Sequence, residues 1–243
     1  MARYILVTGA STGIGAETAR LLAEGNVVFV HYNASRDAAE QTGAEVQSRG
    51  GTAHLVQADL ATEAGCDALY SLVSILTNRL DVLVNNAGGL IERQSLAELE
   101  WSLMERVFAL NVFSAMMMTR LCLPLLERGH DPCIVNISSI AARHGAPTAT
   151  IYGAAKGAID SLTRGMAGEL APRIRVNAVA PGVIETPFHE KVSTPERMRE
   201  FAGRTPLGRN GQAIHIARAI EFLIDNDFVT GETIDVNGGL FMR

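Results

Sequence analysis

Short apolar runs alternate along the chain with longer stretches in which apolar residues recur every three or four positions. The runs are rich in β-branched residues and nearly continuous in apolar character, as in parallel strands buried on both faces. They cover residues 4–8, 27–32, 52–58, 81–86, 133–138, 174–180 and 232–236. The periodic stretches predict helices over 13–24, 37–49, 62–78, 98–127, 152–170 and 212–224.

The regular alternation of strand and helix predicts an α/β fold with right-handed crossovers. We expect a single Rossmann-type doubly wound domain over residues 1–243, with a seven-stranded, mostly parallel sheet and helices on both faces. Residues 182–211 break the rhythm because they are rich in Gly, Pro and charge and exceed an ordinary connection in length. This segment predicts a mobile substrate lid at about 183–206.

Charge and cysteine content narrow the class of protein. A net charge of −5 and a pI of about 5.7 argue against a nucleic-acid partner, which needs a basic face. The first apolar run breaks at Thr8-Gly9, and no later run reaches about 18 residues, so we expect no membrane partner. Three scattered cysteines predict reduced, buried thiols, a cytoplasmic protein and no metal site.

A glycine-rich turn, TGASTGIG, follows the first strand and precedes a helix. Glycines there permit a tight turn and a close backbone approach to a pyrophosphate, while the helix N-terminus attracts the anion. The spacing G-x-x-x-G-x-G differs from the commoner G-x-G-x-x-G, and a merely structural turn is the alternative. The position favours dinucleotide binding by Gly9, Ser11, Thr12, Gly13, Ile14 and Gly15.

The end of the second strand bears on the choice of cofactor. NAD enzymes of this architecture hold the ribose 2′-hydroxyl with an acidic residue there, whereas this chain has Tyr32. Asn33, Ser35 and Arg36 follow, a group suited to a 2′-phosphate, so we favour NADP(H), with NAD(H) still possible. The glycine turn contains no basic residue, which counts against NADP(H). Alternatively, Arg36 is a solvated charge and Asp37 caps the next helix.

The end of the third strand offers a candidate for the adenine ring. Asp59 is placed to accept a hydrogen bond from the adenine amino group, with Leu60 beside it. The alternative is that Asp59 only caps the helix that starts at Thr62.

Tyr152 and Lys156 stand one helical turn apart among small residues, in YGAAK. A carbonyl that accepts a hydride needs a proton donor for the developing alkoxide. A free phenol has a pKa of about 10, and one fixed cation about 4 Å away is worth about 4 kcal/mol, or roughly three pKa units. We therefore expect Lys156 to lower the pKa of Tyr152, although such a pair is also common on helix surfaces.

Taken in order, these motifs resemble those of the short-chain dehydrogenases/reductases. The match consists of TGASTGIG, NNAG at 85–88, Asn111, Ser139, Tyr152-x-x-x-Lys156 and the Pro-Gly pair at 181–182. It covers essentially the whole chain, including the tail FVTGETIDVNGG. Within the family it is most similar to the 3-oxoacyl-carrier-protein reductases and to sugar or polyol dehydrogenases.

The resemblance implies catalytic roles for Asn111, Ser139, Tyr152 and Lys156. Ser139 would hold the carbonyl oxygen, because it lies 13 residues before Tyr152, while Ser138 supports the backbone. Asn111 would hold a water that links Lys156 to solvent; a satisfied core amide is the alternative.

The resemblance also implies further cofactor contacts. Lys156 would bind the nicotinamide ribose next to the catalytic Tyr152. The other expected cofactor contacts are Asn86, Ala87, Gly88, Pro181, Gly182, Ile184 and Thr186. Because the helices at 98–127 and 152–170 pack between subunits in the family, we expect a homotetramer or homodimer.

The substrate carries no chemical signature that we can recognise in the sequence. The expected function is an NADP(H)-dependent oxidoreductase acting on a carbonyl or secondary alcohol: a 3-oxoacyl thioester, a sugar or polyol, or another ketone. The alternatives are a non-catalytic NAD(P)-binding sensor or scaffold and, less well matched, a dehydratase or epimerase. Candidates for substrate contact are Gly89, Leu90, Ile91, Arg93, Arg143, His144, Phe188 and His189, of which the histidines and arginines are more typical of solvated charges.

Overall fold

The computed structural model describes residues 1–242, except the side chains of 189–191. The strands are β1 (Tyr4–Val7), β2 (Val27–Tyr32), β3 (Thr52–Gln57), β4 (Val82–Asn85), β5 (Cys133–Ile137), β6 (Arg175–Pro181), β7 (Ile184–Glu185), β8 (Gly211–Gln212) and β9 (Thr233–Val236). The α-helices are α1 (Gly13–Leu21), α2 (Arg36–Ser48), α3 (Glu63–Leu76), α4 (Trp101–Phe108), α5 (Ser114–Leu126), α6 (Ala141–His144), α7 (Thr150–Leu170), α8 (Pro187–Val192), α9 (Pro195–Arg204) and α10 (Ala213–Asp225).

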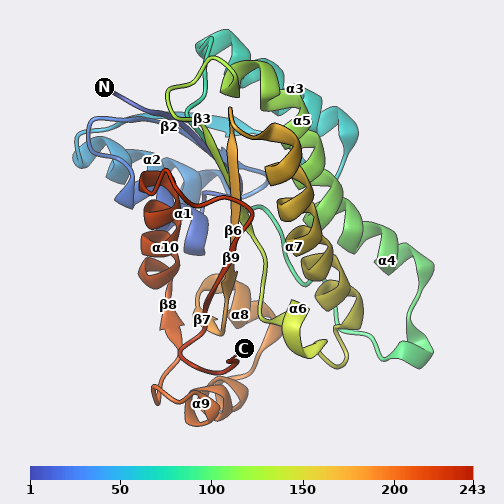
Figure 1. The fold of residues 1–243 in the computed structure, drawn as a ribbon. Coiled ribbons are helices and arrows are strands. Elements are labelled where there is room, and N and C mark those ends of the chain that lie inside the picture. Colours follow the sequence, from blue (N-terminus) through green and yellow to red (C-terminus); the bar gives the residue numbers. More distant parts are fainter. Residues whose placement is uncertain (243) are drawn as a thin grey trace.

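Seven strands form one sheet in the order β3-β2-β1-β4-β5-β6-β9, and every pairing in it is parallel. Helices α1, α2 and α10 cover one face, and α3, α5 and α7 cover the other (Figure 1). The predicted doubly wound α/β fold is confirmed, and the sheet is parallel throughout its length.

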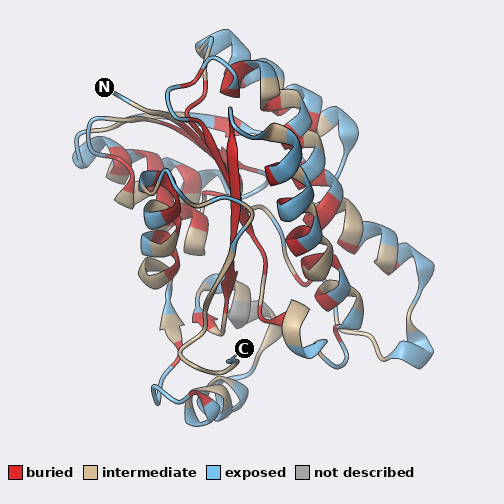
Figure 2. Ribbon diagram, viewed as in Figure 1, coloured by how far each residue is buried: buried red, intermediate tan, exposed pale blue. Residues whose placement is uncertain are grey.

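Successive residues of each strand point alternately into the two hydrophobic cores on opposite faces of the sheet. Ile5 and Val7 pack under α1 and α10, whereas Leu6 packs toward α3 and α5, and all three are fully buried. Both faces of the sheet are covered, so its strands read as continuous apolar runs (Figure 2). The three cysteines are buried and unpaired.

The predicted helix over 98–127 consists of three segments. A π-helical turn, Ala109–Phe113, separates α4 from α5, and a 3₁₀ turn, Leu96–Glu98, precedes α4. The stretch from Trp101 to Leu126 is long and apolar enough to span a membrane, but half of its most apolar window is buried in the protein. It packs against α3 and α7 as a core helix.

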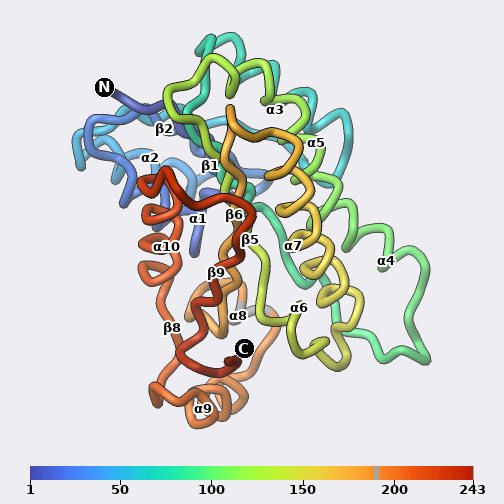
Figure 3. The backbone as a smooth tube through the Cα atoms, in the orientation of Figure 1, coloured from blue at the N-terminus to red at the C-terminus, as the bar shows by residue number. Residues whose placement is uncertain are grey.

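The carboxyl ends of the strands gather the elements that form the site. Helices α6, α8 and α9 and the C-terminal segment cluster at this end of β5, β6 and β9 (Figures 1 and 3). The segment predicted as a lid holds β7, α8 and α9, and β7 pairs with β8. Ligands of open α/β sheets bind at this edge.

Candidate active site

The glycine-rich turn lies where β1 ends, next to the switch in strand order between β1 and β4. Gly9 and Gly13 adopt positive φ angles of 64° and 59°. Helix α1 begins at Gly13, and the Thr12 side chain makes no capping hydrogen bond with a described residue. The first amide groups of α1 are therefore left for an anion at the cavity wall.

A buried hydrogen-bond network fixes this turn from below. The Gly9 amide donates to Nδ1 of His31 at 2.9 Å, and the Asn86 side-chain amide donates to the Gly9 carbonyl at 3.0 Å. The Thr8 hydroxyl accepts from the Asn86 backbone amide at 2.9 Å. The turn is thus tied to β2 and to the end of β4 before any ligand binds.

His31 serves this network as a neutral ring. Because Nδ1 accepts from Gly9, Nε2 carries the proton and faces the Ala58 carbonyl at 3.2 Å. Burial lowers the pKa of His31 to about 4, against weaker raising effects of the Ala58 carbonyl and of Asp59. Both ring nitrogens are satisfied only while the ring is neutral.

Two glycines bring backbone into close approach around the cavity. A Cβ on Gly15 would lie 2.4 Å from the Gly9 carbonyl oxygen, and one on Gly88 would lie 2.7 Å from Oδ1 of Asn111. The cavity beside them has a volume of about 690 Å³ and runs from the glycine turn to Tyr152. An uncapped helix N-terminus, a glycine cradle and a cavity of this extent fit the pyrophosphate and nicotinamide of a dinucleotide.

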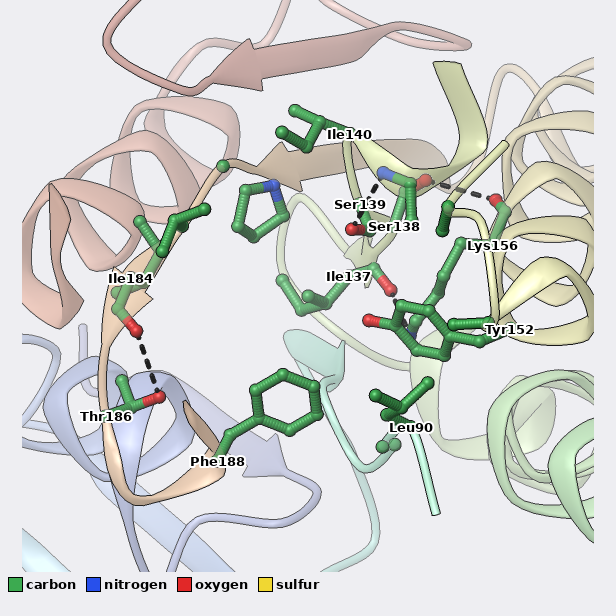
Figure 4. A pocket seen from close by; sticks show the side chains of 18 of the residues that line it. Leu90, Ile137, Ser138, Ser139, Ile140, Tyr152, Lys156, Ile184, Thr186 and Phe188 are labelled. Atoms are coloured by element: carbon green, nitrogen blue, oxygen red, sulfur yellow. Dashed lines mark hydrogen bonds between the residues drawn. The ribbon is translucent and has the colours of Figure 1, made fainter. Parts of the chain in front are cut away.

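Helix α7 presents Tyr152 and Lys156 to the cavity beside Ser139, which follows β5 (Figure 4). The Ser139 hydroxyl is close enough to the Tyr152 phenol to oppose part of the rise in its pKa. Nζ of Lys156 donates to the Ile137 carbonyl at 2.9 Å and lies 5.8 Å from the centroid of the Tyr152 ring. The predicted catalytic trio of hydroxyl, phenol and ammonium is brought together.

The expected lowering of the Tyr152 pKa is wrong for the protein alone. Burial raises the pKa of Tyr152 to about 12, and the hydrogen bond from Ser139 only partly opposes it. Burial also lowers the pKa of Lys156 to about 8, although Asp160 raises it. Nζ of Lys156 lies 5.8 Å from the ring centroid, and desolvation of the phenol outweighs its attraction.

The two neighbouring serines have different environments. Ser138 is buried and its hydroxyl donates to the Lys156 carbonyl at 3.1 Å, which supports the backbone of α7. Ser139 lines the cavity, and its hydroxyl accepts from the Ala141 amide at 3.1 Å. Their placement agrees with Ser139 as the substrate-facing residue.

Asn111 lies in the π-helical turn between α4 and α5 and is buried. Its side chain exchanges two hydrogen bonds with Gly89, donating to the carbonyl at 2.9 Å and accepting from the amide at 3.0 Å. It also donates to the Val107 carbonyl at 2.9 Å. Asn111 therefore anchors the loop after β4, and such π-turns are frequent at functional sites.

Arg143 is a partly buried, ion-paired cation, so its expectation as a solvated surface charge is wrong. Its guanidinium, on α6, forms an ion pair with Asp160 on α7 and contacts Asp235 on β9 at 3.3 Å. Asp160 also accepts from the Thr233 hydroxyl at 3.3 Å. These bonds join the segment after Ser139 to the helix that carries Tyr152.

The cavity gathers most of the predicted site residues but not all. It is lined by Gly9, Thr12, Gly13, Ile14, Asn86, Gly88, Ser139, Tyr152, Lys156, Pro181, Gly182, Ile184 and Thr186. Outside its lining lie Ser11, Gly15, Tyr32, Asn33, Ser35, Arg36, Asp59, Leu60, Ala87 and Asn111.

The predicted 2′-phosphate group lies at the end of β2, on the surface. Arg36 Nε donates to Glu40 at 2.8 Å, and its side chain is 73% exposed. The Arg36 guanidinium is close enough to Tyr32 for the two groups to interact electrostatically. Arg36 therefore lies close to Tyr32, the position that is acidic in NAD enzymes of this architecture. The Glu40 carboxylate would compete with a 2′-phosphate for the Arg36 guanidinium.

Asp59 does not cap α3. The N-cap is Thr62, whose hydroxyl accepts from the Gly65 amide at 3.0 Å. The Asp59 carboxylate instead accepts from the Ala61 amide at 3.1 Å and stays exposed. The alternative of a capping role for Asp59 is wrong, and its proposed contact with adenine stays a prediction.

The segment predicted as a lid contributes an aromatic and a basic side chain to the cavity that holds Tyr152. The ring centroid of Phe188, on α8, lies 6.5 Å from that of Tyr152 (Figure 4). Arg197 and Phe201 of α9 also line the cavity, as does His144 of α6. The side chain of His189 lies outside the described residues.

Several residues at the site did not stand out in the sequence. His31 was available as a lone polar ring inside an apolar strand, a signal that a buried partner exists. Arg197 and Phe201 lie on an exposed amphipathic helix and carry no comparable signal. The same holds for Leu240 and Phe241 of the C-terminal segment, which close the cavity beside α9.

Comparison with known proteins agrees with this geometry. A family model described as an enoyl-(acyl carrier protein) reductase matches residues 9–241. A cyclopentanol dehydrogenase from Comamonas testosteroni is 37% identical over 244 residues, covering 98% of this chain and 96% of the relative. The chain belongs to the short-chain dehydrogenase/reductase family. A 3-oxoacyl-(acyl-carrier-protein) reductase from a Synechocystis strain is 38% identical, covering 99% of this chain and 98% of that relative.

Solved structures of the family share the whole fold. An NADH-dependent reductase responsible for alginate metabolism superposes with a TM-score of 0.91 at 30% identity, covering 100% of this chain and 98% of the other. The angucycline C-6 ketoreductase LanV with bound NADP superposes with a TM-score of 0.90 at 30% identity, covering 98% and 95%. The chain is therefore an oxidoreductase of CH–OH or C=O groups that acts on small molecules.

Proposed function

We propose that the protein is an NADP(H)-dependent carbonyl reductase in which Tyr152 donates the proton. The observation that carries this proposal is the meeting of Tyr152, Ser139 and Lys156 at one end of a cavity whose other end is the uncapped N-terminus of α1. Bound reduced nicotinamide supplies the hydride. A non-catalytic sensor would not need this hydroxyl, phenol and ammonium set around one cavity.

In this proposal four side chains divide the work of carbonyl reduction. The Ser139 hydroxyl holds the carbonyl oxygen, and the Tyr152 phenol, which lines the same cavity, transfers its proton to that oxygen as it becomes an alkoxide. Lys156 keeps a positive charge beside the phenol and binds the nicotinamide ribose. Asn111 fixes the loop at Gly89 and, through a water, links Lys156 to solvent.

The preference for NADP(H) rests on the end of β2. Tyr32 stands where a carboxylate would select against a 2′-phosphate, and Arg36 lies near it with Asn33 and Ser35 beside the first turn of α2. The remaining adenosine contacts proposed are Asp59 and Leu60. One structural relative carries NADP and another is NADH-dependent, so each nucleotide has a precedent in the family.

We further propose a cytoplasmic homotetramer or homodimer with a mobile lid at about 183–206. Large apolar side chains on α4 and in the segment that leads into α5 support subunit packing: Trp101 is 70% exposed and Phe113 is 54% exposed. The buried, unpaired cysteines are typical of a reducing compartment.

Isotope transfer tests the reaction type. Reduced nicotinamide cofactor with deuterium at both positions of carbon 4 is incubated with the protein and a panel of ketones and aldehydes, and the alcohols are analysed by mass spectrometry. Deuterium on the new carbinol carbon is the expected result. Oxidation of the cofactor without deuterium in any alcohol, or tight cofactor binding without consumption, would contradict the proposal.

A further inference from the structure

The cavity around Tyr152 is lined by cations and, among the described residues, by no Asp or Glu. Its charged lining consists of Arg93 from the loop after β4, Lys156, and Arg197 and Arg204 of α9. The chain as a whole has a net charge of −5, so the positive charge of the cavity lining is a local feature. A concave site of one sign concentrates ligands of the opposite sign.

Arg93 and Arg197 are the cations in this lining that lack both a catalytic task and a carboxylate. Lys156 serves the phenol, and Arg204 lies 3.7 Å from the Glu200 carboxylate. Arg93 and Arg197 form no ion pair with a described residue; Arg197 stacks on Phe201, 5.5 Å from the ring centroid. Their charges are unneutralised within the described part of the chain.

Arg93 is held in a costly state. Its Nε is buried without a hydrogen-bond partner among the described residues, and its Nη1 donates a long hydrogen bond to the Thr148 hydroxyl at 3.4 Å. Burial lowers the pKa of Arg93, and the charge of Arg197 lowers it further. The unpaired Nε and the repulsion between Arg93 and Arg197 both destabilise this state. An anion bound between the two guanidinium groups would accept a hydrogen bond from Nε and would neutralise the repulsion.

Arg93 lies on the Tyr152 side of the cavity rather than at the glycine turn. The Gln94 amide next to it donates to the carbonyl of Thr148, a residue that precedes α7, at 3.0 Å. Ile91, Ala146 and Thr148 all have positive φ, of 57°, 41° and 64°. Backbone strain in non-glycine residues, above all in β-branched ones, persists where a functional site requires it.

Resting on the proposed function, we infer that the carbonyl substrate carries an anionic group, a carboxylate or a phosphate, bound by Arg93 and Arg197. Guanidinium groups match such anions with paired hydrogen bonds. The carbonyl of the same molecule meets Tyr152 and Ser139, and its apolar part packs against Leu90 and Phe188. An uncharged ketone of the same size is the poorer substrate.

Matched substrate pairs test this inference and separate the two anions. We would measure kcat/KM with NADPH for 4-oxopentanoate against its methyl ester, and for dihydroxyacetone phosphate against dihydroxyacetone. In at least one pair, kcat/KM should be about 10-fold or more higher for the charged member. This is the value of one charge-assisted contact. The pair that shows the preference identifies the anion.

Substitutions at the two arginines assign the preference to them. Arg93→Gln and Arg197→Gln, on different elements, should each bring the charged-to-uncharged ratio close to one. Arg199→Gln is the matched control, because Arg199 lies on the same helix as Arg197, is 72% exposed and is absent from the cavity lining. A ratio unchanged in both variants, or a rise in KM for NADPH in place of the ketone, would overturn the inference.

A binding measurement separates this inference from the proposed function. Added 4-oxopentanoate or inorganic phosphate should raise the thermal midpoint of the wild type and of Arg199→Gln, but not of Arg93→Gln. If this pattern holds and no ketone is reduced, the anion site stands and the reductase proposal fails. If esters and acids react equally and neither anion shifts the midpoint, the anion site fails and the reductase proposal stands.

Discussion

The cavity has two walls, and different kinds of structural element form them. The inner wall, formed by the glycine turn, Ser139, Tyr152 and Lys156, rests on strand ends and on buried hydrogen bonds such as that from Gly9 to His31. The outer wall, formed by Arg93, Phe188, Arg197 and Phe201, comes from a loop and from the lid.

Burial separates the two walls. Lys156 is 4% exposed, whereas none of the described residues of α9 is buried. The inner wall can therefore hold reacting groups in one geometry, because they stand on the end of β5 and on the long helix α7. The outer wall is free to vary in charge and shape without disturbing the sheet, which suits the selection of substrate.

The largest expected effect comes from removing the inner-wall cation. Lys156→Met should lower kcat/KM for ketone reduction by about 10³-fold, because it removes the charge that assists proton transfer. In the wild type, kcat/KM should fall as pH rises through about 8, where Lys156 loses its proton. A pH profile that is flat from 6 to 9 would mean that the ammonium has no part in the step.

Buried and exposed ion pairs should differ in how much they contribute to the free energy of unfolding of the protein. Arg143→Met leaves the buried Asp160 without its cation and should lower the free energy of unfolding by about 3 kcal/mol in urea titrations. Arg199→Met, which removes a lid ion pair with 72% exposed partners, should leave stability unchanged within error. Equal losses in the two variants would show that burial does not set the contribution of these ion pairs to stability.

The neutral His31 ring predicts a pH dependence of stability. The pKa of His31 is about 4 in the folded protein and about 6.5 when unfolded, so the unfolded chain binds the extra proton between these values. Stability is then fully present above pH 6.5 and is lost as pH falls toward 4, by about 2 kcal/mol at pH 5.

Comparison with His31→Gln isolates this contribution from those of the carboxylates. The difference in unfolding free energy between pH 7 and pH 5 should be about 2 kcal/mol smaller in the variant than in the wild type. An identical pH dependence in both proteins would show that folding does not change the pKa of His31.

The smallest expected effect lies at the surface, at the adenosine end. Arg36→Ala should raise KM for NADPH about tenfold and leave KM for NADH unchanged, because one exposed phosphate contact is lost. Steady-state kinetics with both cofactors measure the split. An equal change for NADH and NADPH would remove Arg36 from 2′-phosphate recognition.

The inner wall could be predicted from the sequence because each part of it has a local cause. Continuous apolar runs specify a parallel sheet, a glycine turn after the first strand specifies an anion site, and the spacing of Tyr152 and Lys156 places both on one helix face. The doubly wound fold follows from that pattern, whereas the role of Ser139 was expected only from the resemblance to the family.

The parts that were not predicted depend on contacts between distant segments. The ion pairs of Arg143 join α6, α7 and β9, and no local pattern announces them. The high pKa of Tyr152 arises from desolvation in the assembled cavity, which spacing along a helix cannot report. The basic outer wall likewise exists only once the loop after β4 faces α9.

The most direct test of the central claim is the kcat/KM of Tyr152→Phe for ketone reduction, with cofactor affinity measured in parallel by fluorescence titration. Proton donation by Tyr152 predicts a fall of about 10³-fold with unchanged affinity for the reduced cofactor. A variant that reduces ketones as fast as the wild type would show that the proton comes from another group.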